Sequence, residues 1–122
     1  MLSIHSGMRY FLYQGYADMR KSFHGLCGIV TNELHQDIMS GDVFIFLNKR
    51  KTHIKLLVWE GDGFAIYYKR LEQGTFEFPV TSSEDSGLLI SYNQLLLILQ
   101  GISLKEVHYR KRYKKDNLSY FR

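Results

Sequence analysis

The sequence predicts a single α+β domain in which an antiparallel β-meander packs against an N-terminal helix and a second, C-terminal helix. Three observations predict this class. Between residues 42 and 78, runs of β-branched and aromatic residues alternate with short breaks of Gly, Asn and Asp. Ahead of this region, apolar residues recur at helical spacing. Behind it, a helix-capping motif precedes a leucine-rich run.

The first elements predicted are a strand over residues 8–13, closed by Gln14 and Gly15, and a helix over residues 19–34. Asp18 is the expected N-cap of this helix, because its carboxylate can accept from N–H groups of the first turn. The helix is predicted from one apolar stripe with α-helical spacing, formed by Met19, Phe23, Leu26, Cys27, Val30 and Leu34.

The meander is predicted to contain four strands, over residues 42–47, 52–60, 64–72 and 75–78. The breaks between them are so short that neighbouring strands must run antiparallel. On the second strand, Ile54, Leu56 and Val58 point to one face, and Lys55 and Leu57 point to the other.

Two hairpin registers are open for the second and third strands. A two-residue Asp62-Gly63 loop places Lys55 opposite Arg70, and a three-residue loop from Gly61 places Lys55 opposite Lys69. Like charges that face each other destabilise a ladder. Either register gathers positive charge at one end of the sheet, beside the Lys49-Arg50-Lys51 turn. These side chains either extend into water or bind an anion.

The C-terminal part begins with a polar loop over residues 79–87. Ser91 and Gln94 then have the spacing of a capping box, so a helix is expected over the leucine-rich segment that ends at Leu99, with Gly101 as its C′ stop. Residues 104–122 form either a short continuation or a tail that becomes ordered on a partner.

Length and composition favour one soluble domain over residues 1–122, with a basic tail at 105–122. No apolar run is long enough for a membrane span, and no secretory signal is expected at the N-terminus. The single cysteine, Cys27, excludes a framework of internal disulfides and fits a reducing cytoplasm. The expected location is therefore the cytoplasm.

The positive charge is concentrated at the C-terminal end. Residues 105–122 hold seven basic and two acidic residues, a net charge of +5 in a chain whose total is +4, so residues 1–104 carry −1. Aromatic residues alternate with the cations, as in His108 and Tyr109 before Arg110 and Tyr113 behind Arg112. Such a segment can neutralise phosphates while its rings stack on bases or sugars.

Catalytic chemistry has little support in the sequence. The five histidines show no metal-ligand spacing, and Cys27 lies on the apolar helix stripe, where cysteine behaves as a small hydrophobe. Asp18, Glu60 and Asp62 are the acidic residues to weigh as a divalent-metal cluster for a nuclease, although a helix cap and a tight hairpin also explain them. No cofactor, catalytic residue or metal site is predicted.

The chain contains several distinctive segments, at residues 18–26, 41–46, 55–64 and 68–76, with a basic close over residues 101–105 and 110–113. Together these segments resemble the small accessory protein, encoded by the second reading frame and called TnpB, of bacterial transposable elements of insertion sequence family sixty-six. The resemblance covers roughly residues 7–113. Glu60 and His24 depart from it, because the family more often has Asp at the first position and frequently has Asp at the second.

The resemblance implies a bacterial protein with a non-catalytic role in DNA transposition and recombination, beside a separate transposase and other transposon-encoded proteins. For its task we expect DNA binding through the phosphate backbone, because no segment resembles a base-reading helix. Neutralising about five phosphates would give log K a slope of about −4 to −5 against log salt. The expected DNA-binding residues are Lys49, Arg50, Lys51, Lys55, Lys69 and Arg70 on the sheet, and Arg110, Lys111, Arg112, Lys114 and Lys115 in the tail.

An alternative is a protein–protein adaptor that docks on the transposase without touching DNA. Leu57, Trp59, Tyr67 and Tyr68 would then form an exposed aromatic patch, unless they pack in the core under a helix. The sequence leaves the oligomeric state and any DNA sequence preference open.

Overall fold

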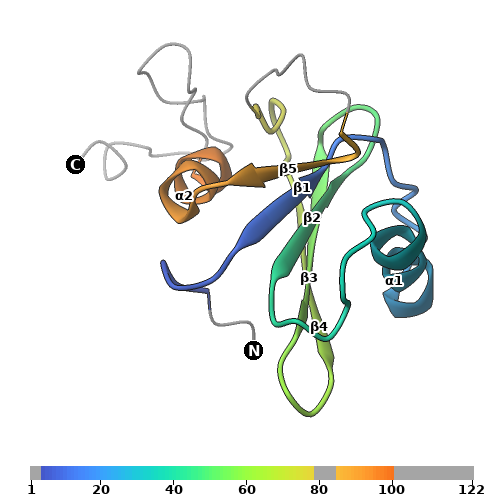
Figure 1. Ribbon diagram of the computed structural model, residues 1–122. Coiled ribbons are helices and arrows are strands. Elements are labelled where there is room, and N and C mark those ends of the chain that lie inside the picture. The colour runs from blue at the N-terminus through green and yellow to red at the C-terminus, as the bar shows by residue number, and fades with distance from the viewer. Residues whose placement is uncertain (1–3, 79–84, 101–122) are drawn as a thin grey trace.

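The computed structural model describes residues 4–78 and 85–100. Its elements are β1 (Tyr10–Tyr13), α1 (Phe23–Asn32), β2 (Val43–Leu47), β3 (His53–Trp59), β4 (Phe64–Arg70), β5 (Gly87–Ile90) and α2 (Tyr92–Leu99). The strands form one five-stranded sheet in the order β4-β3-β2-β1-β5, and the two helices lie on opposite sides of it (Figure 1). The α+β class is confirmed.

The sheet is mixed, which corrects the expectation of a purely antiparallel one. β1 pairs in parallel with β2, with Tyr10 opposite Val43, whereas the remaining neighbours are antiparallel. A parallel neighbour needs a crossover connection, and α1 lies within that connection. Arg9 and Asp42 tie the two strand starts together, because the guanidinium donates from Nη2 to Oδ2 at 2.8 Å and from Nε to Oδ1 at 3.2 Å.

The sheet has a core on each face. On the α2 side, the buried residues from the strands, α2 and the connecting loops are Tyr10, Leu12, Val43, Ile45, Leu47, Ile54, Leu56, Val58, Phe76, Ile90, Leu95 and Ile98. On the α1 side they are Ala17, Leu26, Ile29, Val30, Leu34, Phe44, Phe46 and Leu57. The alternation of Ile54, Leu56 and Val58 against Lys55 and Leu57 agrees with the face assignment from the sequence.

The meander contains β2, β3 and β4, and the fourth predicted strand, over residues 75–78, does not form. In that segment Phe76 N–H donates to the Lys51 carbonyl at 2.7 Å, and the Phe76 ring is completely buried. A strand that was not predicted, β5, begins at Gly87, the last residue of the expected polar loop, and pairs with β1.

Both predicted hairpin registers are wrong. Trp59 pairs with Phe64, so four residues form the loop, and Lys55 faces Tyr68 rather than a basic residue. Glu60 N–H donates to the Gly63 carbonyl at 2.8 Å. Gly61 has a φ of +94°, a backbone conformation that is unfavourable for residues with a side chain. The longer loop removes the expected opposition of like charges.

The predicted cap is confirmed for α2 and wrong for α1. For α2 the capping box is confirmed, because Ser91 Oγ accepts from Gln94 N–H and the Gln94 side chain accepts from Ser91 N–H. Gly101 lies outside the described residues. For α1 the predicted cap is wrong: the helix begins at Phe23, and Asp18 binds Arg20 in the loop before it.

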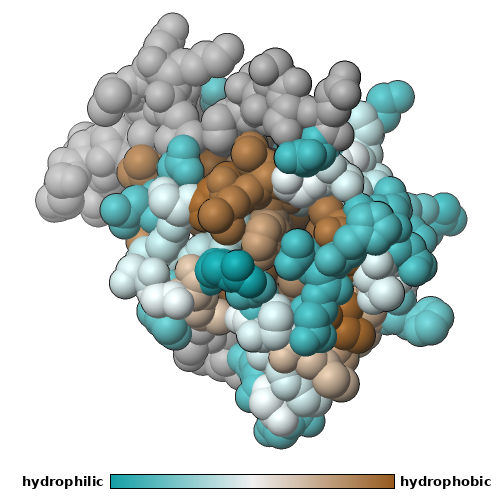
Figure 2. Space-filling view, in the orientation of Figure 1, coloured by the Kyte–Doolittle hydropathy of each residue, from teal (hydrophilic) through white to brown (hydrophobic). Residues whose placement is uncertain are grey.

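Figure 2 shows apolar side chains gathered over α2 and β5.

We predict that Phe76→Ala lowers the free energy of unfolding by about 3–5 kcal/mol, because it leaves a cavity in the core on the α2 side. Chemical denaturation followed by circular dichroism measures the change. Thr75→Ala, at the exposed neighbouring position, serves as the control and should change stability by less than about 0.5 kcal/mol. Equal small effects of both substitutions would show that this segment does not contribute to the core.

Candidate nucleic-acid interface

Three consecutive basic residues form the turn between β2 and β3. Lys49 and Arg50 are exposed at the tip, and Lys51 is partly exposed. Lys51 adopts a left-handed backbone with φ of +59°, an unfavourable conformation for a residue with a Cβ. Its N–H donates to the Asn48 carbonyl at 3.0 Å, which closes the turn.

A network around Asn48 fixes the shape of this turn. Asn48 Oδ1 accepts from the backbone N–H groups of Thr52 and His53 at 2.9 and 3.0 Å, and its Nδ2 donates to Thr52 Oγ1 at 3.0 Å. His53 Nδ1 lies 3.2 Å from Asn48 Nδ2 and 2.8 Å from Thr52 Oγ1. The basic side chains therefore project from a turn that is held from within. The sequence marked the turn, but not this network.

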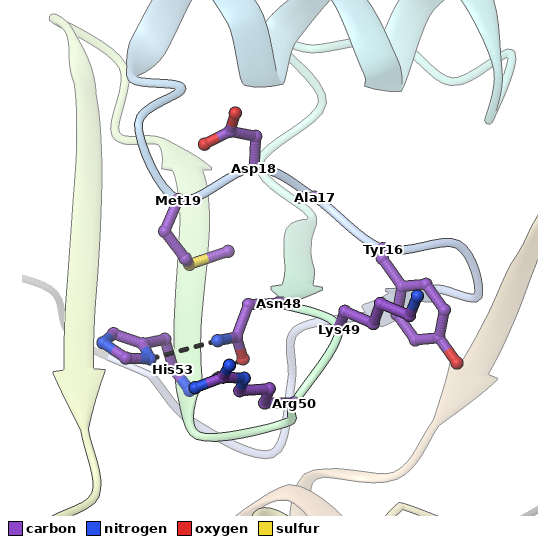
Figure 3. A pocket seen from close by; sticks show the side chains of 8 residues that line it. All are labelled: Tyr16, Ala17, Asp18, Met19, Asn48, Lys49, Arg50 and His53. Atoms are coloured by element: carbon purple, nitrogen blue, oxygen red, sulfur yellow. Dashed lines mark hydrogen bonds between the residues drawn. The ribbon is translucent and has the colours of Figure 1, made fainter.

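An open pocket of about 430 Å³ adjoins the basic turn (Figure 3). One wall is the turn itself, with Asn48, Lys49 and Arg50, together with His53. The other wall is the loop before α1, from which Tyr16, Ala17, Asp18 and Met19 contribute. The loop is fixed to the sheet by a 2.9 Å bond from Ala17 N–H to the Leu47 carbonyl. No sequence pattern indicated that this loop would lie beside the turn.

The Asp18 carboxylate in this pocket is neutralised by Arg20. Arg20 Nη2 lies 2.6 Å from Asp18 Oδ2, and Arg20 N–H donates to Oδ1 at 2.9 Å. These hydrogen bonds from Arg20 lower the pKa of Asp18 from 3.8 to about 2. The carboxylate thus stays ionised and paired near neutral pH, and it adds little net negative charge to the pocket.

Lys55 differs from the other predicted DNA-binding residues because it is buried. Its ammonium Nζ donates to the backbone carbonyls of Met19 at 2.9 Å and Lys21 at 2.7 Å, and it lies 4.6 Å from the centre of the Tyr68 ring. Lys55 is only 6% exposed. It therefore holds the loop before α1 against the sheet, and we leave it out of the candidate interface.

The other basic residues of the sheet are arranged as follows. Arg70 is exposed, lies opposite His53 and pairs with Glu72 at 2.9 Å. Lys69 points to the α2 side, where its Nζ donates to the Leu99 carbonyl at 3.1 Å. The sheet thus brings Arg70 to the same end as the basic turn and directs Lys69 to the opposite face. Arg110, Lys111, Arg112, Lys114 and Lys115 lie outside the described residues.

The predicted aromatic patch does not form one surface. Leu57 is buried under α1, and Trp59 is partly buried with its ring 5.0 Å from that of Phe64. Tyr67 and Tyr68 are exposed, but they are consecutive residues of β4 and point to opposite faces. The four residues therefore do not share the single exposed surface that the adaptor hypothesis expected of them.

The acidic residues weighed as a metal cluster lie in two places. Asp18 lines the pocket near the start of β3, whereas Glu60 and Asp62 lie in the loop beyond the end of β3. Within residues 4–78 and 85–100, no group of three His, Cys, Asp or Glu side chains is placed to hold a metal ion. Neither of the two described helices has the length and apolar content to span a lipid bilayer.

Comparison with known proteins adds a family. Residues 8–109 match the family described as IS66 Orf2 like protein. Two proteins of Sinorhizobium fredii are similar to the chain. Uncharacterized protein y4jC is 30% identical, with 94% of this chain and 96% of the relative covered, and Uncharacterized protein y4hO is 31% identical, with 84% and 87% covered. No solved structure matches the chain.

We predict that Lys55→Met lowers the free energy of unfolding by about 2 kcal/mol, because two carbonyls lose a charged hydrogen-bond donor. Lys49→Met makes the same chemical change at an exposed site and should stay within about 0.5 kcal/mol of wild type. Denaturation curves of the three proteins provide the measurement. Equal stability of the Lys55 variant and wild type would contradict the role of Lys55 as a tether.

We also predict that Asp18 titrates at about 2 in the folded protein and that Arg20→Ala raises this pKa toward 3.8. Because the folded pKa is depressed, the stabilisation from the pair is present above about pH 3.8 and is lost as pH falls toward 2. NMR titration of the Asp18 carboxyl carbon measures both values. Lys21→Ala, which removes a more weakly coupled cation, should produce a smaller shift. A midpoint near 3.8 in wild type would contradict the pairing.

Proposed function

Since this chain belongs to the IS66 Orf2-like family, we propose that it is a non-catalytic accessory protein of IS66 transposition that binds DNA through the phosphate backbone, alongside the transposase. The observation that carries the DNA-binding part is the rigid basic turn. Lys49, Arg50 and Lys51 are consecutive residues of one closed turn, and Arg70 lies at the same end of the sheet. Several cations at one end of the sheet favour binding to a polyanion.

Contacts to the phosphate backbone, rather than to base edges, fit the distribution of charge. Neither α1 nor α2 contains a lysine or arginine, and each helix buries its apolar face against the sheet. A helix that reads bases needs polar or basic side chains directed into the major groove. The basic residues instead lie on a turn and at strand ends, where they can contact phosphates without entering a groove.

The pocket beside the turn gives the proposed interface a second kind of contact. Tyr16 is 58% exposed on the pocket wall that faces Lys49 and Arg50. A tyrosine ring next to two cations can stack on a sugar or an unpaired base while the cations hold the adjacent phosphates. The basic tail at 105–122 is proposed to add further phosphate contacts, because it carries a net charge of +5.

We predict that binding to a fluorescent duplex has a slope of log K against log salt of about −4 to −5, and that Lys49→Gln with Arg50→Gln reduces its magnitude by about 2. Fluorescence anisotropy over a salt series measures both slopes. Arg9→Gln is the matched control, because it removes one cation from the far end of β1 and leaves an amide that can bond Asp42. A salt-independent affinity, or no affinity, would exclude the DNA-binding role.

A full-length variant with the five tail cations Arg110, Lys111, Arg112, Lys114 and Lys115 changed to glutamine separates the tail from the turn. If the tail and the turn both contribute, each variant reduces the magnitude of the slope, and the combined variant reduces it further. Loss of all binding in the tail variant, together with a wild-type slope in the turn variant, would show that the turn is not an interface.

A further inference from the structure

One edge of the sheet, as formed by residues 4–78 and 85–100, is a seven-residue strand. β4 (Phe64–Arg70) is the last strand of the order β4-β3-β2-β1-β5, and only β3 pairs with it among the described residues. It contains no proline and no bulge, and Tyr67 and Tyr68 are exposed on it. Proteins usually shorten, interrupt or cover such edges, because a free edge pairs with another strand.

The hydrogen-bonding phase of β4 follows from the ends of its hairpin. Glu60 N–H donates to the Gly63 carbonyl, and Leu71 N–H donates to the Thr52 carbonyl at 2.9 Å. Because bonded and non-bonded pairs alternate in an antiparallel ladder, the odd-numbered residues of β4 direct their N–H and C=O groups toward β3. The even-numbered residues, which are Phe64, Ile66, Tyr68 and Arg70, direct theirs outward.

This pattern is complementary to itself. A twofold axis through Tyr67 places Ile66 opposite Tyr68 of a second copy and Phe64 opposite Arg70, so outward-bonding residues always meet outward-bonding residues. All seven residues of β4 are paired, and about eight backbone hydrogen bonds become possible. An axis between two residues would place outward-bonding residues opposite inward-bonding ones, and is excluded.

The side chains of β4 also suit this register. Lys69 faces Ala65 of the second copy and Arg70 faces Phe64, so no two basic residues oppose each other. The two Tyr67 rings meet at the axis in a non-hydrogen-bonded pair, where side chains lie closest. Aromatic pairs at such positions stabilise antiparallel strands. The exposed Tyr67 and Tyr68 thereby gain cross-strand contacts that one copy cannot supply.

We propose that the protein forms a twofold homodimer through β4, in which the two sheets join into one continuous sheet with Tyr67 at the axis. In this register no two basic side chains oppose each other and the two exposed Tyr67 side chains meet, and this placement favours a second copy as the partner. The proposal is independent of DNA binding and is tested without DNA. It predicts a species of twice 14.4 kDa in solution.

Disulfide trapping in the full chain tests the register. In a Cys27→Ala background, Tyr67→Cys places two thiols at the axis, at a Cα separation of about 4.5 Å, which a disulfide can bridge. Arg70→Cys is the matched control on the same exposed strand. Its counterpart lies opposite Phe64, about 20 Å along the ladder, beyond the roughly 7 Å limit for a disulfide. Mild oxidation should link Tyr67→Cys into a covalent dimer on a non-reducing gel, whereas Arg70→Cys should run as a single chain because no disulfide joins its two copies.

Sedimentation of uncross-linked protein tests the backbone contacts. Tyr68→Pro removes an outward N–H without breaking the ladder to β3, so it should shift the mass from dimer to monomer over a dilution series. Tyr68→Thr also loses the ring but retains the N–H, and should remain a dimer. Wild-type protein that is monomeric throughout the series, or equal linking of the two cysteine variants, would overturn the proposal. The trapping pair decides the question if Tyr68→Pro does not fold.

Discussion

The structure depends on the burial of β2 and β3 on both faces. Every residue of β2 is buried, with Phe44 and Phe46 toward α1 and Ile45 toward α2. A sheet whose central strands are apolar on both faces must be covered on both faces, because it otherwise exposes a large apolar surface to water. The crossover between β1 and β2 supplies α1 for one face. The C-terminal helix α2 and the Phe76 ring close the other.

This constraint explains why a lysine is found in the interior. Lys55 occupies a position on β3 that faces the α1 side, where covering the sheet leaves this residue only 6% exposed. Two loop carbonyls and the Tyr68 ring replace water around the charge, which lowers the cost of burying it. The same bonds place the loop before α1 beside the basic turn. One buried cation thus helps to shape a surface on which other cations are exposed.

Sequence patterns predicted the elements that carry their own local signals. The three strands from β2 to β4 and the capping box at Ser91 are set by neighbours a few residues away, and the structure confirms them. The predicted start of α1 was wrong, because Asp18 has the chemistry of a helix cap but binds Arg20 instead. β5 was missed because four residues carry little pattern, and its pairing with β1 is a contact between distant parts of the chain.

The sequence by itself therefore determined the α+β class, the family and the concentration of positive charge at the β2–β3 turn and in the tail. These follow from residue order, composition and spacing. Only the tertiary structure decided that β1 and β2 run parallel, that Lys55 is internal while Lys49 and Arg50 are exposed, and that β4 is an edge strand of the described sheet. Burial, ladder phase and strand order are properties of segments far apart in the chain, and no local pattern encodes which of two equally basic side chains the fold will enclose.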